Sequence, residues 1–167
     1  MSGIEIERKF IIEMPSESEL SANPGYSVSE ITQIYLSAPK GVTHRVRARK
    51  ANGKTVYTET KKIRIDKISA FEDEREISEE QFRALAENIK EGTVPVKKTR
   101  YTISHEKKTF EIDVYPQWKR TAIMEVELSD RKDSVLFPSF IKIKREVSGI
   151  REYSNASMSK SFPEEDA

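Results

Sequence analysis

Charged side chains alternate with mostly apolar ones along several short segments of this chain, and within most of these rows the charges have one sign. The acidic members are Glu5, Glu7, Glu72, Glu74, Glu111, Asp113, Glu125 and Glu127. The basic members are Lys9, Arg45, Arg47, Arg49, Lys61, Lys98 and Arg100. Carboxylates ligate hard divalent cations, whereas guanidinium and ammonium groups bind phosphate oxygens. A polyphosphate together with Mg²⁺ or Mn²⁺ would therefore satisfy both sets of side chains.

The spacing places each charged row on one face of a β-strand, because residues i and i+2 point to the same side. An antiparallel sheet with one face in water would show the same alternation, and ion pairs that raise thermal stability are a second explanation. Neither explains rows sorted by sign, such as Arg45, Arg47 and Arg49, which need counter-charge nearby. Buried charges persist only when they are paired or bind a ligand. We therefore favour a closed barrel with a polar interior.

Eight segments have the period-two alternation typical of half-buried strands. They are residues 4–12, 32–37, 45–49, 56–61, 71–77, 98–101, 110–114 and 123–128. Asn52-Gly53 predicts a tight hairpin between the third and fourth segments. Ser78 and Gln81 form a capping-box sequence, which predicts a helix that extends to Lys90, just before Gly92.

The remainder of the chain is less regular. Ser129 or Asp130 could cap a short helix that Pro138 would end. Trp118 follows a turn and is expected to pack at one end of the barrel. Residues 161–167 are expected to be a disordered tail, because chain ends usually are unless they are tied down.

Composition limits the class of protein. The chain has 167 residues, which suggests one domain, and no cysteine, which excludes a disulfide framework and a cysteine nucleophile. A balance of 29 Lys and Arg against 28 Asp and Glu gives a net charge of +1, unlike a nucleic-acid binder or a disordered chain. The longest run without a charge is ten residues, too short to span a membrane. We expect a cytoplasmic protein that binds neither nucleic acid nor membranes.

Glu5-Ile6-Glu7-Arg8-Lys9 resembles the ExExK signature that opens the CYTH domain of the triphosphate tunnel metalloenzymes. The resemblance continues in order through Arg45-x-Arg47, Thr60-Lys61, Glu72-x-Glu74, Lys98-Thr99-Arg100-Tyr101, Phe110-Glu111-Ile112-Asp113-Val114, Glu125-Val126-Glu127, Glu146-Val147-Ser148 and Tyr153-Ser154-Asn155. The short, single-domain bacterial type is the most similar. The resemblance implies a single domain over residues 1–160 with an α+β, mainly β, fold, in which an eight-stranded antiparallel β-barrel forms a charged tunnel and a few helices pack outside.

The resemblance also implies roles for the charged rows. The metal, Mg²⁺ or Mn²⁺, would be bound by Glu5, Glu7, Asp113, Glu125 and Glu127. The triphosphate would lie against Lys9, Arg45, Arg47, Lys61, Lys98 and Arg100. The further acidic residues of the tunnel would be Glu72, Glu74 and Glu111. The catalytic candidates are Lys98, Tyr35 and Glu127.

Three positions leave alternatives open. Lys61 and Lys62 are adjacent, and parity with Tyr57 favours Lys61 as the residue that faces the tunnel. Tyr35 stands where short bacterial members of the family carry a tyrosine near the reaction centre, but a partly buried strand aromatic is an equal interpretation. Arg49 extends the arginine row beyond the matched pair, towards the tunnel mouth.

The leading functional hypothesis is a divalent-metal-dependent triphosphatase whose substrate is inorganic tripolyphosphate, since no cluster of residues would read a base. Within the family, the alternatives are adenylyl cyclisation of the class IV type and hydrolysis of nucleoside or thiamine triphosphates. A non-catalytic polyphosphate-binding module is a third alternative, but an anion binder gains nothing from the carboxylate rows. The partner is expected to be a small-molecule triphosphate or polyphosphate, and the protein a monomer or homodimer.

Overall fold

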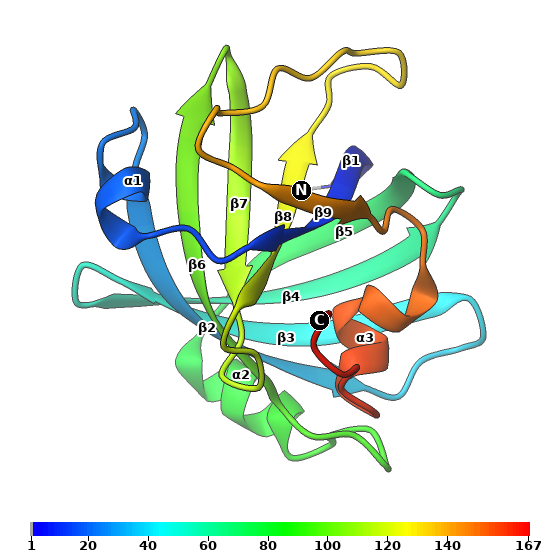
Figure 1. Ribbon diagram of the computed structural model, residues 1–167. Helices are drawn as coiled ribbons and strands as arrows, with labels where there is room; N and C mark the ends of the chain where they lie inside the picture. The colour runs from blue at the N-terminus through cyan, green and yellow to red at the C-terminus, as the bar shows by residue number, and fades with distance from the viewer. Residues whose placement is uncertain (1) are drawn as a thin grey trace.

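The computed structural model describes residues 2–167 and contains nine strands, of which eight close into an antiparallel barrel (Figure 1). The strands are β1 (Ser2–Glu13), β2 (Ser27–Leu36), β3 (Val42–Ala51), β4 (Lys54–Arg64), β5 (Ser69–Ile77), β6 (Val96–His105), β7 (Lys108–Val114), β8 (Thr121–Glu127) and β9 (Ile143–Glu146). The sheet order is β5-β4-β3-β2-β6-β7-β8-β1-β9, and an added β5–β1 pairing closes the barrel. The predicted fold class is thus confirmed.

The helices are short: α1 (Glu17–Ser21), α2 (Glu79–Ala86), the 3₁₀ turn η1 (Arg151–Tyr153) and α3 (Asn155–Met158). No helix among residues 2–167 has the length and apolar character that crossing a membrane requires. The outer faces of β1, β6, β7 and β8 form an apolar cluster with Leu20 of α1 and with Phe137 and Phe140, which lie in the loop between β8 and β9. The outer face of β2–β5 packs against Phe82 and Leu85 of α2. The apolar rows therefore face outwards, where the helices and the loop pack on them, and the charged rows face inwards.

One part of the barrel interior is filled by the C-terminal segment. The first half of β1 pairs with β5, but its second half, at residues 10–12, pairs with β9. Here the inward rows turn apolar, at Ile11, Tyr115 and Ile123, and pack against Tyr153 and Met158 from the segment after β9. The apolar half of the interior is thereby closed, and the charged half stays open as a cavity.

The local predictions have mixed outcomes. The hairpin at Asn52-Gly53 is confirmed, and both residues have the positive φ angles, 52° and 74°, that such a turn requires. The capping box at the start of α2 is confirmed too, with hydrogen bonds in both directions between Ser78 and Gln81. The predicted end at Lys90 is wrong, because the helix ends at Ala86. The Lys90 amide donates instead to the Tyr35 carbonyl at 2.8 Å, which ties this stretch to the edge of β2.

The predicted helix after Ser129 or Asp130 is not formed. The carboxylate of Asp133 accepts hydrogen bonds from the backbone amides of both residues, which satisfies these donors in a turn. The chain then runs on as an irregular loop to Pro138. Its apolar side chains, including Phe137, cover the outer face of the barrel, so tertiary packing decides the conformation here.

The expected disordered tail, residues 161–167, lies against the barrel in the structure. Phe162 packs edge-on to the Trp118 ring, with 5.4 Å between centroids, and the indole N–H of Trp118 donates to the Pro163 carbonyl at 3.0 Å. The Glu165 carboxylate accepts hydrogen bonds from the backbone amides of residues 119–121. These contacts tie the end of the chain to the start of β8, and they also account for the burial of Trp118 at this end of the barrel.

Candidate active site

The charged rows line one cavity of about 820 Å³ inside the barrel. The predicted site residues that line it are Glu5, Glu7, Lys9, Tyr35, Arg45, Arg47, Arg49, Glu72, Glu74, Lys98, Arg100, Glu111, Glu125 and Glu127. They come from seven strands, β1, β2, β3, β5, β6, β7 and β8, so only closure of the barrel brings them together. The cavity is therefore polar and bears both signs of charge.

On β4 the prediction of the inward lysine is wrong. Lys62 lines the cavity, and its ammonium lies 2.8 Å from the Glu5 carboxylate and 3.8 Å from that of Glu72. Lys61 is exposed on the outside. The physical reason is that Tyr57, used to set the parity, packs outside the barrel against Phe82 of α2. Residues of the same parity as Tyr57 therefore face outwards.

One wall of the cavity carries several cations. The Nε atom of Arg45 is buried and makes no hydrogen bond among residues 2–167. Burial, with Arg45 and Arg100 nearby, lowers the pKa of Arg47 to about 9. The Lys98 ammonium is affected in the same way: burial lowers its pKa to about 7, although the Asp113 carboxylate opposes the shift. Each of these features would be relieved by a bound anion.

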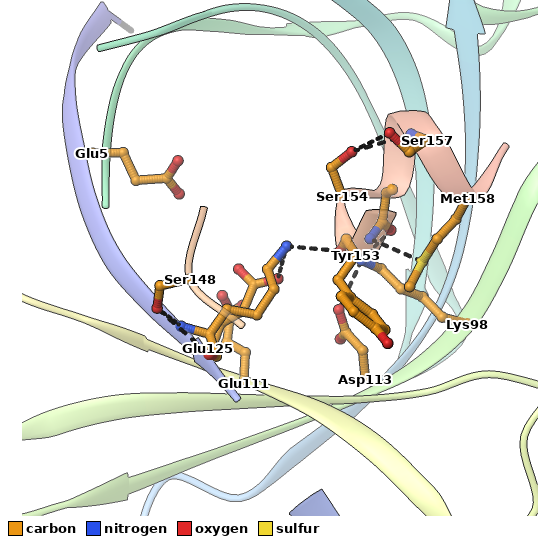
Figure 2. Close-up of polar contacts among 12 residues, drawn as sticks. Glu5, Lys98, Glu111, Asp113, Glu125, Ser148, Tyr153, Ser154, Ser157 and Met158 are labelled. Carbon is orange, nitrogen blue, oxygen red and sulfur yellow. Dashed lines mark hydrogen bonds and ion pairs between the residues drawn. The ribbon is translucent and has the colours of Figure 1, made fainter. Parts of the chain in front are cut away.

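Asp113 lies behind this wall, not at the surface of the cavity. It is fully buried, and its two oxygens accept from Arg100 Nε at 2.8 Å and Nη2 at 2.9 Å. Lys98 Nζ lies 2.8 Å from Oδ2 (Figure 2). Burial alone would raise the pKa of Asp113, but Lys98 and Arg100 outweigh it and lower the pKa to about 2. Asp113 is thus paired with two cations, Lys98 and Arg100. It does not join the cluster of acidic side chains on β1 and β8.

The carboxylates of β1 and β8 are crowded together. Glu7 lies directly opposite Glu127 in the register, and Glu125 lies opposite Lys9. Burial and the Glu125 carboxylate raise the pKa of Glu7 well above its usual range. Glu5 stands apart from Glu125 (Figure 2), and its carboxylate lies 2.8 Å from the Lys62 ammonium.

These residues suit a divalent cation by their chemistry. They offer only carboxylate oxygens, which hard cations prefer, and a bound cation would reduce the repulsion between Glu7 and Glu125 that helps to raise the pKa of Glu7. Within residues 2–167 no three acidic or imidazole side chains already have the geometry of a metal site. Glu5 is turned towards Lys62, and Glu125 lies 3.8 Å from Lys9. Binding a cation would therefore require these ion pairs to rearrange.

Lys9 is held by the C-terminal segment. Its Nζ donates to the carbonyl of Tyr153 at 3.1 Å, and its backbone amide donates to the hydroxyl of Ser148 at 2.9 Å. The motifs at Ser148 and Tyr153 thus have a structural role, which is to fix Lys9 at the end of the charged row on β1.

Two buried residues next to the cavity cations were not among the predicted site residues. Gln33 is fully buried beside Arg47, and Asn155 is nearly so beside Lys98. Gln33 could have been found by its parity with Tyr35 on the same strand. Asn155 ends a motif with no charged residue, so the charge pattern does not mark it.

Comparison with known proteins agrees with this geometry. Residues 3–162 match the family described as CYTH domain. The solved structure of the inorganic triphosphatase NE1496 is 26% identical with a TM-score of 0.60, over 95% of this chain and 96% of that one. The PH1819 protein from Pyrococcus horikoshii OT3 is 24% identical with a TM-score of 0.57, over 77% of this chain and 80% of that one. No curated protein sequence is significantly similar to this chain.

Proposed function

Because the chain belongs to the CYTH domain family, we propose that it is a divalent-metal-dependent triphosphatase that hydrolyses inorganic tripolyphosphate in the barrel cavity. The similarity to the inorganic triphosphatase NE1496, which extends over nearly the whole of both chains, supports this choice within the family. The charged interior supports it independently of any relative.

The observation that carries the proposal is a double imbalance of charge in one cavity. On the basic wall, the Nε of Arg45 has no hydrogen-bond partner among residues 2–167 and the pKa of Arg47 is lowered, so an anion would be stabilised there. On the acidic wall, burial and Glu125 raise the pKa of Glu7, so a cation would be stabilised there. A polyphosphate with a divalent cation corrects both at once.

The residues of the chain divide the work by position. Arg45 and Arg47 would bind phosphate oxygens and oppose the charge that develops on the transferred phosphoryl group. Lys98 Nζ donates to Asp113 and Asn155, which leaves its remaining N–H for a phosphate oxygen. The carboxylates of Glu7 and Glu127 would hold the cation, whose chemistry when bound is to neutralise phosphate oxygens and orient water.

A substrate panel tests the proposal. Wild-type protein is assayed with tripolyphosphate, ATP and thiamine triphosphate, with Mg²⁺ or Mn²⁺ and with EDTA, and free phosphate and cyclic nucleotide are both measured. The expected result is metal-dependent phosphate release that is fastest with tripolyphosphate. Cyclic AMP from ATP would make the protein a cyclase, and tight binding without any release would make it a polyphosphate-binding module.

The carboxylates are tested by a metal titration. Glu127→Gln keeps the shape of the side chain and removes one charge, so we expect a lower rate and a higher Mg²⁺ or Mn²⁺ concentration for half-maximal activity. Glu80→Gln, on the exposed side of α2, is the matched control and should leave both quantities unchanged. Overlapping titrations of Glu127→Gln and wild type would remove Glu127 from the metal site.

A further inference from the structure

Two buried amide side chains meet behind the cationic wall of the cavity. Gln33 on β2 has no exposed surface, and Asn155 at the start of α3 is only 9% exposed. The Gln33 Nε2 donates to Asn155 Oδ1 at 3.2 Å. These residues are 122 positions apart in sequence. The contact therefore joins a barrel strand to the segment that fills one part of the interior.

Gln33 holds Arg47 and Tyr35. Its carbonyl oxygen accepts from Arg47 Nε at 2.9 Å and from Arg47 Nη2 at 2.5 Å. Its Nε2 also donates to the Tyr35 hydroxyl oxygen at 3.0 Å. One edge of the guanidinium is thereby fixed, which leaves its remaining N–H groups for a ligand.

Asn155 holds Lys98 in the same manner. Its Oδ1 accepts from Lys98 Nζ at 2.9 Å, and its Nδ2 donates to the Tyr115 hydroxyl at 3.0 Å. A cation fixes the carbonyl end of each amide, since only an acceptor can face Arg47 or Lys98. The orientation of both amides is therefore determined by their partners.

Arg47 is held by an uncharged amide, whereas Arg100 is held by a carboxylate. A buried cation is ordinarily paired with a carboxylate, as Arg100 is with Asp113 through two hydrogen bonds. Arg47 lies on the same cavity but receives an amide carbonyl, which satisfies its donors without cancelling its charge. We propose that Gln33 and Asn155 are positioning residues that aim Arg47 and Lys98 at the triphosphate. Gln33 does so while leaving the positive charge of Arg47 unneutralised, whereas Asn155 adds a neutral acceptor to Lys98, which Asp113 already pairs at 2.8 Å. The identity of the anion rests on the proposed function.

A carboxylate in place of either amide separates positioning from packing. Asn155→Asp keeps the acceptor for Lys98, and the Tyr115 hydroxyl can turn to donate to the second oxygen. Gln33→Glu likewise keeps the acceptor for Arg47. Gln33→Glu adds a counter-charge to Arg47 but sets a carboxylate oxygen against Asn155 Oδ1, and Asn155→Asp adds a second carboxylate to Lys98 beside Asp113. The attraction to the cation and the repulsion between oxygens oppose each other, so the melting temperature should stay near that of wild type. The same counter-charge competes with the triphosphate, so binding should weaken.

The experiment measures binding, rate and stability on the same preparations. Tripolyphosphate is titrated into wild type, Asn155→Asp and Gln33→Glu by calorimetry in EDTA, where no turnover occurs. Initial rates are then measured with Mg²⁺ or Mn²⁺, and melting temperatures by scanning fluorimetry. Gln81→Glu is the control for net charge, because Gln81 is exposed at the N3 position of α2, where Glu also completes a capping box.

We expect tripolyphosphate to bind Asn155→Asp and Gln33→Glu about tenfold or more weakly, because each charge-assisted contact is weakened. KM should rise with the dissociation constant, while the melting temperature stays near that of wild type and Gln81→Glu keeps wild-type values for all three quantities. A purely structural role predicts wild-type binding in any carboxylate variant that melts normally, and that result overturns the inference. If either variant fails to fold, the other decides. Absence of tripolyphosphate binding by wild type would overturn the proposed function together with this inference, whereas binding without hydrolysis would count against the proposed function alone.

Discussion

At the scale of single residues, the site is defined by which cations are already neutralised. Arg100 has two acidic neighbours, Asp113 at 2.8 Å and Glu111 at 2.9 Å. Burial would lower the pKa of Arg45, but nearby Tyr35, Glu72 and Glu74 raise it, whereas Arg47 is held by the neutral amide of Gln33. In the sequence, Arg45-x-Arg47 and Lys98-x-Arg100 look like the same kind of basic row. Only the positions of Asp113 and Gln33 separate a structural cation from one that is free to bind a ligand.

Replacing Arg45 or Arg47 by Ala should therefore weaken the binding of the triphosphate in the transition state. A charge-assisted contact contributes about 1.5–3 kcal/mol, so kcat/KM for tripolyphosphate should fall roughly tenfold to a hundredfold. The melting temperature should hold or rise, because like charges in one row repel. Arg83→Ala, on the exposed face of α2, is the control and should keep wild-type kinetics. Unchanged kcat/KM in both inward variants would remove β3 from the substrate site.

At the scale of elements, parity predicts the inward face wherever one face of a strand is apolar. The rows on β1, β3, β5, β6 and β8 all face the cavity as expected, since their opposite faces carry the outer apolar clusters. Parity fails on β4, where both faces of Thr58-Glu59-Thr60-Lys61-Lys62 are polar. Only the packing of Tyr57 outside the barrel sets the register there. The length of α2 is overpredicted for a similar reason. The Lys90 amide donates to the Tyr35 carbonyl near the end of β2, so the last predicted turn of the helix does not form.

The register of β4 can be tested with adjacent lysines. Lys62→Ala removes the ammonium beside Glu5 in the cavity, so we expect kcat/KM to fall about tenfold or more, by the same charge-assisted contact. Lys61→Ala removes an exposed ammonium of the same size from the outer face, and its kinetics should match wild type. The two variants lose the same charge, so only orientation can separate them. A larger loss of kcat/KM in Lys61→Ala than in Lys62→Ala would mean that Lys61 faces the cavity, as the sequence suggested.

At the scale of the whole molecule, the C-terminal segment completes the barrel. It supplies the carbonyl that holds Lys9 and the amide that holds Lys98, and its apolar side chains fill the part of the interior that bears no charge. Figure 1 shows β9 beside β1, with α3 and the C-terminus close to each other. The order of the tail was not predictable from local sequence, because it depends on partners at residues 115–121 that lie more than forty positions away.

Glu165 is the main polar anchor of this tail, which gives its contribution a definite pH dependence. Burial by itself would raise the pKa of the Glu165 carboxyl, but hydrogen bonds from Lys119, Arg120 and Thr121 outweigh this effect and lower the pKa to about 2. A carboxyl whose pKa is depressed on folding stabilises the protein above its unfolded pKa, and this stabilisation is lost as the pH falls towards the folded value. The anchor should thus be at full strength at pH 7 and weaken progressively below about pH 5.

Glu165→Gln should accordingly melt at a lower temperature than wild type at pH 7, and the gap between the two should narrow as the pH falls from about 5 towards 2. Glu164→Gln removes the same charge one residue earlier, from an exposed position, and its melting temperature should follow wild type at every pH. Melting curves of the three proteins across this pH range make the comparison. A gap that is constant with pH would mean that Glu165 acts by packing, whereas no gap at pH 7 would mean that the tail contributes nothing to the closure of the barrel.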